Sequence, residues 1–520
     1  MTDLVEDLVH QFTDPYAFYR ELIQNAIDAG SNRIEVTLRY SPTPSAGVTT
    51  AQVQDWGEGM TREIVERFLL TKFRSSKEDD LTKIGKFGIG FMSVFACAPE
   101  LVVVETGRDG EDLRVLLHPD RSYEILACPE PIEGTRVSVH KDMSVADYRD
   151  FVARSHDSVR RWCKHSEADV TFAAGDENGS SPGPGEPVRE PLALDTAFQV
   201  EYREEGTVIV AGPSRDERQT FAGFYNRGLT LLETAEPLAP GVDFKILSRY
   251  LEHTLTRDDI RRDKGFARAM KLLGKLVEGA LEDRLKVELR ALAEKAEDDG
   301  TYWRTLSWAS RRLDPDHLWF PLALGGAVDG RALRRSAKKH GLLYARRAPS
   351  DPLLLALAGE GALVLRHDDW TLKIAEQVTK SKRALAHEGH TVASPGQGAS
   401  TDVETVLAAA VGALLAAAGA RTRTTMMADV CGAGFLQPAV LVDAAGEPTA
   451  SKRSVSSPFK RGCPEVLCLN RAHARITAAL RLSAKSKELA ALLVARGLAS
   501  SWAALDDRAD HRLTEAALSQ

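Results

Sequence analysis

The N-terminal part of the chain holds three motifs in a fixed order: a helix with a polar stripe, followed by two glycine-rich turns. In the first motif, RELIQNAIDAG, residues Glu21, Asn25 and Asp28 stand at positions i, i+4 and i+7, so on a helix they lie within roughly 60° of one another. Apolar residues occupy the other side, which predicts an amphipathic helix over residues 15–29. Taken alone, this stripe also fits an ordinary solvated helix face.

The second motif, VQDWGEGM, predicts a strand that ends in Asp55 and is followed by a tight turn. A carboxylate at a strand end can accept a hydrogen bond from a donor such as an exocyclic amine. The glycines Gly57 and Gly59 permit the turn and let a ligand come close to the backbone. By itself, the motif fits an ordinary turn with a polar side chain equally well.

The third motif, IGKFGIGFMSVFAC, places Gly85, Gly88 and Gly90 before an apolar helix expected at residues 91–97. A glycine-rich loop that leads into a helix N-terminus presents free N–H groups and the positive end of the helix dipole, which suits a phosphate. The spacing is neither that of a dinucleotide-binding fingerprint nor that of a Walker A loop, so the motif alone is a weak signal.

Length and composition are typical of a multidomain globular protein. The 520 residues favour roughly three or four domains, and the hydrophobic and charged fractions are ordinary. The formal net charge of −7 gives no global attraction to nucleic acid or anionic lipid, so we expect neither as a partner. The apolar run at 406–420 is shorter than the ~20 residues that span a bilayer, and we expect a buried helix there. Scattered cysteines and the lack of an opening signal segment predict reduced thiols and a cytoplasmic location.

Two stretches rich in Gly, Pro and Ser are typical of flexible connections or long loops, and they divide the chain into expected domains at 1–173, 188–387 and 402–520. In the first domain, strands and helices are mixed rather than strictly alternating, which favours an antiparallel or mixed sheet covered by helices on one side. The middle domain combines strand-like alternation with a long charged helix at 266–296 and a βαβ-like unit, which makes it α/β. The last domain is alanine-rich and is expected to be mainly helical.

The order and spacing of the three motifs resemble those of the GHKL ATPases, the group that contains DNA gyrase B subunits, heat-shock protein 90, MutL and histidine kinases. The resemblance implies the Bergerat fold, an α/β sandwich that holds ATP between a helix and a lid. It also implies that Asn25 binds Mg²⁺ on the phosphates, that Glu21 is the general base, and that Asp55 takes the adenine amine. Thr135, in a Gly-Thr pair before a strand, resembles a threonine that supports adenine binding. The other residues expected to line the nucleotide pocket are Asp28, Gly57, Gly59, Met60, Gly85, Lys86, Phe87, Gly88, Ile89, Gly90 and Phe91.

Finer matches are similar to the heat-shock protein 90 family. RELIQNAIDAG and IGKFGIGFMSVFA look like that family's forms of the motifs, and the stretches FYNRGLTLLE and VDFKILSRYLEHTLTRDDIRRDKGFARAMKLLGK are similar to its middle domain. On that match, Arg257 stands where the family places the arginine that reaches the γ-phosphate; the alternative is an ordinary helix-start arginine. The resemblance implies an ATP-hydrolysing chaperone, working as a homodimer that closes on non-native client proteins.

Two alternatives from other classes stand beside the chaperone. One is a DNA-associated GHKL ATPase like MutL or the MORC proteins, and the other is a nucleotide-dependent signalling or defence switch with a dedicated protein partner. A sensor kinase is not expected, because those proteins lack a hydrolytic glutamate at the position of Glu21. The DNA alternative draws on a basic cluster, which also fits a solvated helix face. The cluster consists of Arg331, Arg334, Arg335, Lys338, Lys339 and His340.

Overall fold

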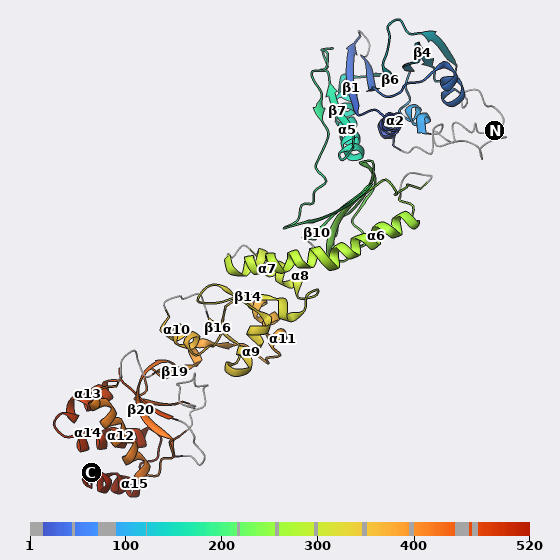
Figure 1. Cartoon of the computed structure of the whole chain (residues 1–520). Coiled ribbons are helices and arrows are strands. Elements are labelled where there is room, and N and C mark those ends of the chain that lie inside the picture. Colours follow the sequence, from blue (N-terminus) through green and yellow to red (C-terminus); the bar gives the residue numbers. More distant parts are fainter. Residues whose placement is uncertain are drawn as a thin grey trace, which may run out of the picture. The chain divides into compact units, whose positions relative to one another are not determined.

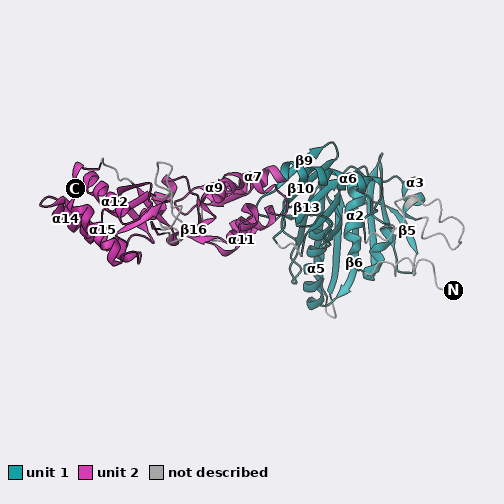
Figure 2. Cartoon of the chain, turned by 90° about the horizontal axis from the view of Figure 1, so that it is seen from below, with its two compact units in different colours: residues 1–281 teal, residues 282–520 magenta. Residues whose placement is uncertain are grey.

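The computed structural model describes residues 14–43, 47–70, 90–120, 122–215, 219–254, 259–295, 300–345, 351–394, 400–442, 457–459 and 466–519. Figure 1 follows their helices and strands along the chain. The chain divides into two compact units, residues 1–281 and residues 282–520 (Figure 2). This division falls inside the predicted middle domain, and the three predicted domains stay a prediction.

The first unit opens with a mixed sheet whose strand order is β5-β4-β3-β6-β2-β1-β7-β8. In its described pairs, β1 and β7 run parallel and the other neighbours run antiparallel. The predicted α/β arrangement with a mixed sheet is confirmed. The strands are β1 (Arg33–Pro42), β2 (Gly47–Asp55), β3 (Leu101–Arg108), β4 (Glu111–Leu117), β5 (Tyr123–Ala127), β6 (Gly134–Met143), β7 (Asp169–Ala174) and β8 (Glu186–Pro187).

The sheet buries one set of alternating side chains under helices. In β1, Ile34, Val36 and Leu38 are fully buried, as the two-residue period of a strand requires for one face against a core. The helices that share this core are α2 (Ala17–Asp28), η3 (Gly90–Cys97) and α5 (Val145–Cys163). Helix α2 contacts both η3 and α5. Helix α2 ends where Gly30, at φ +80°, turns the chain towards β1. The helix predicted at 15–29 is therefore confirmed.

A second sheet in the first unit has the order β12-β11-β13-β10-β9 and precedes the predicted long helix. That helix forms as α6 (Lys264–Leu276), the π-helical turn η4 (Val277–Leu281) and α7 (Glu282–Lys295), so the prediction is confirmed with a break in the middle. The strands are β9 (Val200–Glu204), β10 (Thr207–Pro213), β11 (Ala222–Asn226), β12 (Leu229–Thr234) and β13 (Val242–Ser248).

The second unit contains the predicted βαβ-like arrangement. Strands β16 (Leu343–Ala345) and β17 (Val364–Arg366) are parallel, and α10 (Pro352–Gly359) connects them. Strand β18 (Leu385–Ala386) lies on the other side of β16. Other elements of this part are α8 (Thr301–Ala309), η5 (Pro315–His317), β14 (Trp319–Pro321), β15 (Ala327–Asp329), α9 (Gly330–His340), α11 (Asp369–Thr379) and η6 (His387–Gly389).

The C-terminal part of the second unit combines helices with a sheet of order β19-β20-β22-β21. Strand β19 (Thr391–Ser394) falls in the stretch expected to be a flexible connection, so that part of the stretch is ordered structure. The remaining elements are α12 (Asp402–Ala417), β20 (Thr424–Gly432), β21 (Ala439–Val442), β22 (Val466–Asn470), α13 (Ala474–Ser483), α14 (Lys487–Ser501) and α15 (Asp507–Leu518). Within the described ranges, no helix is long and apolar enough to cross a membrane.

Candidate nucleotide-binding site

Helix α2 carries the first predicted motif in the expected register. Glu21 is buried, with 4% of its surface exposed, and Asn25 is half-buried one turn later. Asp28 is the last residue of the helix and is more exposed. Exposure therefore increases along the stripe, from the buried carboxylate of Glu21 to the solvent-accessible carboxylate of Asp28. An ordinary solvated helix face, the alternative explanation, would expose all three side chains.

Asp55, at the end of β2, is a buried carboxylate held by its own turn. It is 8% exposed, and the backbone N–H of Gly57 donates to its Oδ1 at 2.8 Å. Burial raises the pKa of the Asp55 carboxyl, while hydrogen bonds from the backbone of Gly57 and Thr135 act in the opposite direction. A partly desolvated carboxylate with acceptor capacity left over suits a ligand that brings its own N–H donor.

The turn after Asp55 packs directly on the end of α2. The backbone N–H of Glu58 donates to the carbonyl of Ala29 at 3.0 Å. A Cβ on Gly57 would lie 2.7 Å from that same carbonyl oxygen, so the approach requires glycine. The first and second motifs, separate in sequence, thus form one surface.

Two further glycines allow this turn to pack against the sheet. Gly59 has φ +64°, and a Cβ there would lie 2.1 Å from the carbonyl oxygen of Gly107. Gly134 has φ +75°, and a Cβ there would lie 2.3 Å from the carbonyl oxygen of Asp55. Both positions combine a left-handed backbone with a contact that leaves no room for a side chain.

Thr106 on β3 joins the turn to the predicted Gly-Thr element and was missed by the sequence analysis. Its Oγ1 accepts the backbone N–H of Met60 at 2.8 Å and donates to the carbonyl of Gly134 at 3.2 Å. It also lies 3.1 Å from the Oγ1 of Thr135, directly opposite on β6. Thr106 continues the buried face of Val102 and Val104, so a hydroxyl on an otherwise apolar strand face was the available signal.

The third motif is described only from Gly90 onwards. Gly90 and Phe91 begin η3, a 3₁₀ helix that packs against α2, so the predicted helix at 91–97 is confirmed with tighter winding. Phe91 is buried in the hydrophobic core of this part of the unit. The predicted phosphate-loop residues Gly85, Lys86, Phe87, Gly88 and Ile89 lie outside the described residues, as does Arg257.

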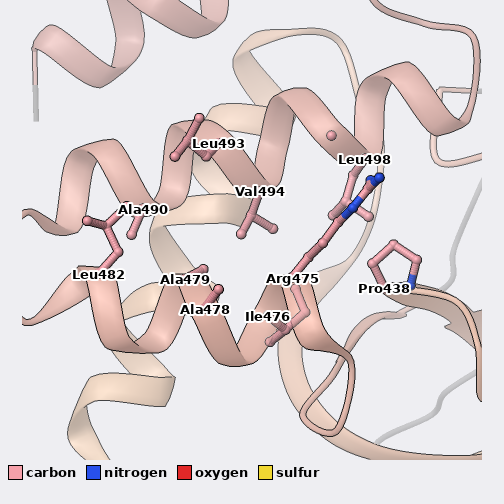
Figure 3. A pocket seen from close by; sticks show the side chains of 11 residues that line it. Pro438, Arg475, Ile476, Ala478, Ala479, Leu482, Ala490, Leu493, Val494 and Leu498 are labelled. Carbon is pink, nitrogen blue, oxygen red and sulfur yellow. The ribbon is translucent and has the colours of Figure 1, made fainter.

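The second unit holds an apolar pocket of about 380 Å³ between α13 and α14 (Figure 3). Leu482, Leu493 and Val494 line it, and Arg475 and Pro438 flank one end. A nucleotide triphosphate requires several donors for its phosphates and an acceptor for its base, and this lining does not provide such a set. The site built on α2 and β2 is therefore a better candidate for a nucleotide than this pocket.

Comparison with known proteins identifies the same region. Residues 18–119 match the model of a family described as histidine kinase-, DNA gyrase B-, and HSP90-like ATPase. This match runs from α2 to just beyond β4 and includes all three motifs. The chain therefore carries a GHKL ATPase domain.

Several curated proteins resemble the chain over part of its length. The chaperone protein HtpG of Methylococcus capsulatus is 32% identical over 154 residues, which cover 24% of each protein. HtpG of Methylorubrum populi is 26% identical over 211 residues, which cover 35% of this chain and 34% of that protein. The DNA mismatch repair protein MutL of Opitutus terrae is 32% identical over 133 residues, covering 24% of this chain and 20% of MutL. The alignments thus span about a fifth to a third of the length of these relatives.

Proposed function

We propose that the first unit binds ATP with the adenine amine on Asp55 and the phosphates over α2 and the start of η3. The observation that carries this proposal is the buried Asp55 carboxylate, held by Gly57 at 2.8 Å beside the end of α2. The turn at 55–60 fixes the carboxylate without using all of its acceptor sites, so an exocyclic amine can complete them. Thr106, whose hydroxyl lies 3.1 Å from that of Thr135, supports this turn by accepting the N–H of Met60.

The residues on α2 fit a magnesium nucleotide and its hydrolysis. The amide oxygen of Asn25 is a hard oxygen donor of the kind that Mg²⁺ accepts, and Glu21 lies one helical turn away. When bound, Mg²⁺ would neutralise phosphate charge. Glu21 would orient a water molecule and accept its proton, because a buried carboxylate near the phosphates is placed to act as a general base.

We further propose that the whole chain works as an ATP-dependent chaperone of the heat-shock protein 90 type, as a homodimer that closes on non-native client proteins. The relatives named HtpG support this class. The resemblance of the stretches FYNRGLTLLE and VDFKILSRYLEHTLTRDDIRRDKGFARAMKLLGK to that family's middle domain also supports it. On this proposal, Arg257 supplies positive charge to the γ-phosphate during hydrolysis.

A DNA-associated ATPase is the second candidate, because MutL is also among the relatives. Its other support, the basic helix α9, is weakened by pairing: Arg331 and Arg334 both contact Asp316, at 3.3 and 2.7 Å. His340, from the same cluster, is buried. Salt-dependent binding of duplex DNA by the full chain would favour this candidate over the chaperone, since phosphate contacts release counterions.

The deciding experiment measures ATP binding and steady-state ATP hydrolysis separately. We expect Asp55→Asn to lose binding, and Glu21→Ala and Arg257→Ala to bind ATP but hydrolyse it at least about a hundredfold more slowly. Normal turnover by Arg257→Ala would contradict the chaperone-type middle domain and favour the DNA-associated or switch-like alternatives. Normal binding by Asp55→Asn would contradict the nucleotide site itself.

A further inference from the structure

The turn between β11 and β12 has an unusual residue at its tip. Asn226 pairs with Leu229, and the two residues between them, Arg227 and Gly228, have φ of +48° and +80°. Two positive φ angles in a two-residue hairpin define a type I′ turn, in which Asn-Gly and Asp-Gly are strongly preferred. The hairpin between β3 and β4 closes in the same way with Asp109 and Gly110. An arginine in this conformation is uncommon, and such an outlier points to a functional contact.

The tip docks on the end of α5 and the chain that follows it. The backbone N–H of Glu167 donates to the carbonyl of Arg227 at 3.3 Å, and the Oγ1 of Thr230 donates to the carbonyl of Arg161 at 2.8 Å. A Cβ on Gly228 would lie 1.9 Å from the carbonyl oxygen of His165. The turn is therefore fixed against the backbone of α5 and of the residues that follow it.

From this fixed position, the Arg227 side chain reaches α2, the helix of the proposed nucleotide site. Its Nη1 lies 3.0 Å from Oδ1 of Asp28, the last residue of α2, although the two are 199 positions apart in sequence. Asp28 follows Asn25 by one turn and precedes Ala29, which holds the turn after Asp55. A cation at a helix C-terminus is also favoured by the helix dipole.

The neighbouring tip residue reaches in another direction. The Nδ2 of Asn226 donates to the carbonyl of Leu251 at 2.7 Å. Leu251 begins a loop that is closed by the bridge between His253 and Ile260 and by a hydrogen bond from the N–H of Arg261 to Glu252, at 2.7 Å. Adjacent residues of one rigid turn thus hold the end of α2 and the base of this loop.

We infer that the Asn226-Arg227 tip couples the nucleotide helix α2 to the base of the 251–261 loop, with Arg227 as a positioning residue. Displacement of the α2 end is transmitted through the Asp28 ion pair to the tip, and from Asn226 to Leu251. This inference rests on the proposed ATP site for its effect on turnover, but the mechanical link itself is a property of the free protein.

Hydrogen exchange of the free full chain tests the link without nucleotide. We expect Arg227→Gln to speed exchange of the Thr254 and Arg261 amides about threefold, and Asn226→Ala to do the same for the Ala29 and Gly30 amides, because each variant loosens the far side of the tip. The matched control is Arg203→Gln on β9 of the same sheet: Arg203 is also exposed and also pairs with a carboxylate, at 2.6 Å, but its partner is Glu201. The inference would be overturned if exchange changed only on the side of the tip that carries the mutation, or if Arg203→Gln had the same effects.

Kinetics then separate positioning from binding. We expect Arg227→Gln to lower kcat about fivefold with the Kd for ATP changed less than twofold. Arg227→Lys should recover part of the loss, and Arg203→Gln should match wild type. Combining Asp28→Asn with Arg227→Gln should be no worse than the poorer single variant, because both remove the same pair. Additive losses, or unchanged kcat in Arg227→Gln, would contradict the positioning role. If wild type neither binds nor hydrolyses ATP, the proposed function fails, while the exchange result still decides the link.

Discussion

Two turns meet the end of α2, and they differ in whether a strained side chain makes the contact. The turn at 55–60 uses Gly57 and Gly59 where backbones come close, so its sequence agrees with its local geometry. The turn at 226–229 places Arg227 in a left-handed conformation, against local preference, and uses its side chain to reach Asp28. Both turns use glycine where backbones come close, since Gly228 meets the carbonyl of His165, but only the second turn also accepts local strain at a large side chain to gain a long-range contact.

The difference predicts where each turn is sensitive to mutation. Substitutions of the glycines in the first turn should create clashes with the backbone. They should abolish the site and also lower the free energy of unfolding. Substitutions of Arg227 in the second turn should leave the fold intact or stabilise it, and should change only the coupling that runs through the Asp28 contact. The following tests take this contrast from its largest expected effect to its smallest.

Gly59→Ala should give the largest effect. The new Cβ would meet the carbonyl oxygen of Gly107 at 2.1 Å in a backbone conformation of φ +64°, so we expect a loss of roughly 3 kcal/mol or more in the free energy of unfolding and no ATP binding. Gly110→Ala is the matched control, with φ +82° and no atom within 4 Å of the added Cβ, and should lose about 1 kcal/mol. Urea unfolding measures both; equal losses would show that the close packing of the first turn is unimportant.

ATP affinity should depend on pH through Asp55. Burial raises the pKa of this carboxyl in the folded protein above its value in the unfolded chain. The protonated carboxyl therefore favours the folded state. This contribution to stability is complete below the unfolded pKa and is lost as pH rises through the folded pKa. An adenine amine requires the ionised form, so binding should weaken about tenfold per pH unit below that folded pKa. Calorimetric titration across acidic pH checks this, with inosine triphosphate, which lacks the amine, as the control. A Kd that is flat for ATP as pH falls would remove Asp55 from the base pocket.

The contrast between the turns also explains what could be predicted from sequence. Asp55, Gly57 and Gly59 follow one another, so their chemistry and their turn are both visible in a short motif. The mixed sheet followed from strand-like alternation, since Ile34, Val36 and Leu38 mark one buried face. Local periodicity thus predicted the helices and strands, and short motifs predicted those site residues that lie close together in the sequence.

The remaining features depend on pairings between distant segments. Thr106 is placed opposite Thr135 only by the register of β3 on β6, which sequence spacing does not specify. Arg227 meets Asp28 only because the second sheet docks on α5 within the first unit. The residue preferences of two-residue hairpins predict an unfavourable turn for the FYNRGL segment. The contact with Asp28, which explains the arginine at this position, lies in another part of the fold.

Thr106→Val should have an intermediate effect on the first turn. The substitution leaves the N–H of Met60 without its acceptor, and we expect a loss of about 1–2 kcal/mol in the free energy of unfolding, with weaker ATP binding. Thr49→Val is the control: Thr49 is equally buried, and its hydroxyl has no hydrogen-bond partner in the described structure, so this change should be neutral or slightly stabilising. Thermal unfolding compares the two variants. Equal effects would show that the Thr106 hydroxyl does not support the turn.

Arg227→Asn should give the smallest change in stability, and of the opposite sign. Asparagine tolerates the left-handed conformation that arginine resists, which favours folding by about 1 kcal/mol, while the lost half-exposed ion pair to Asp28 costs about half as much. We therefore expect a net gain of about 0.5 kcal/mol in urea unfolding together with slower ATP turnover. Asp109→Arg introduces the same residue into the same turn type between β3 and β4, and should destabilise by about 1 kcal/mol without changing turnover. A more stable Arg227→Asn with unchanged turnover would show that the strained arginine transmits nothing, and the two turns would then differ only in composition.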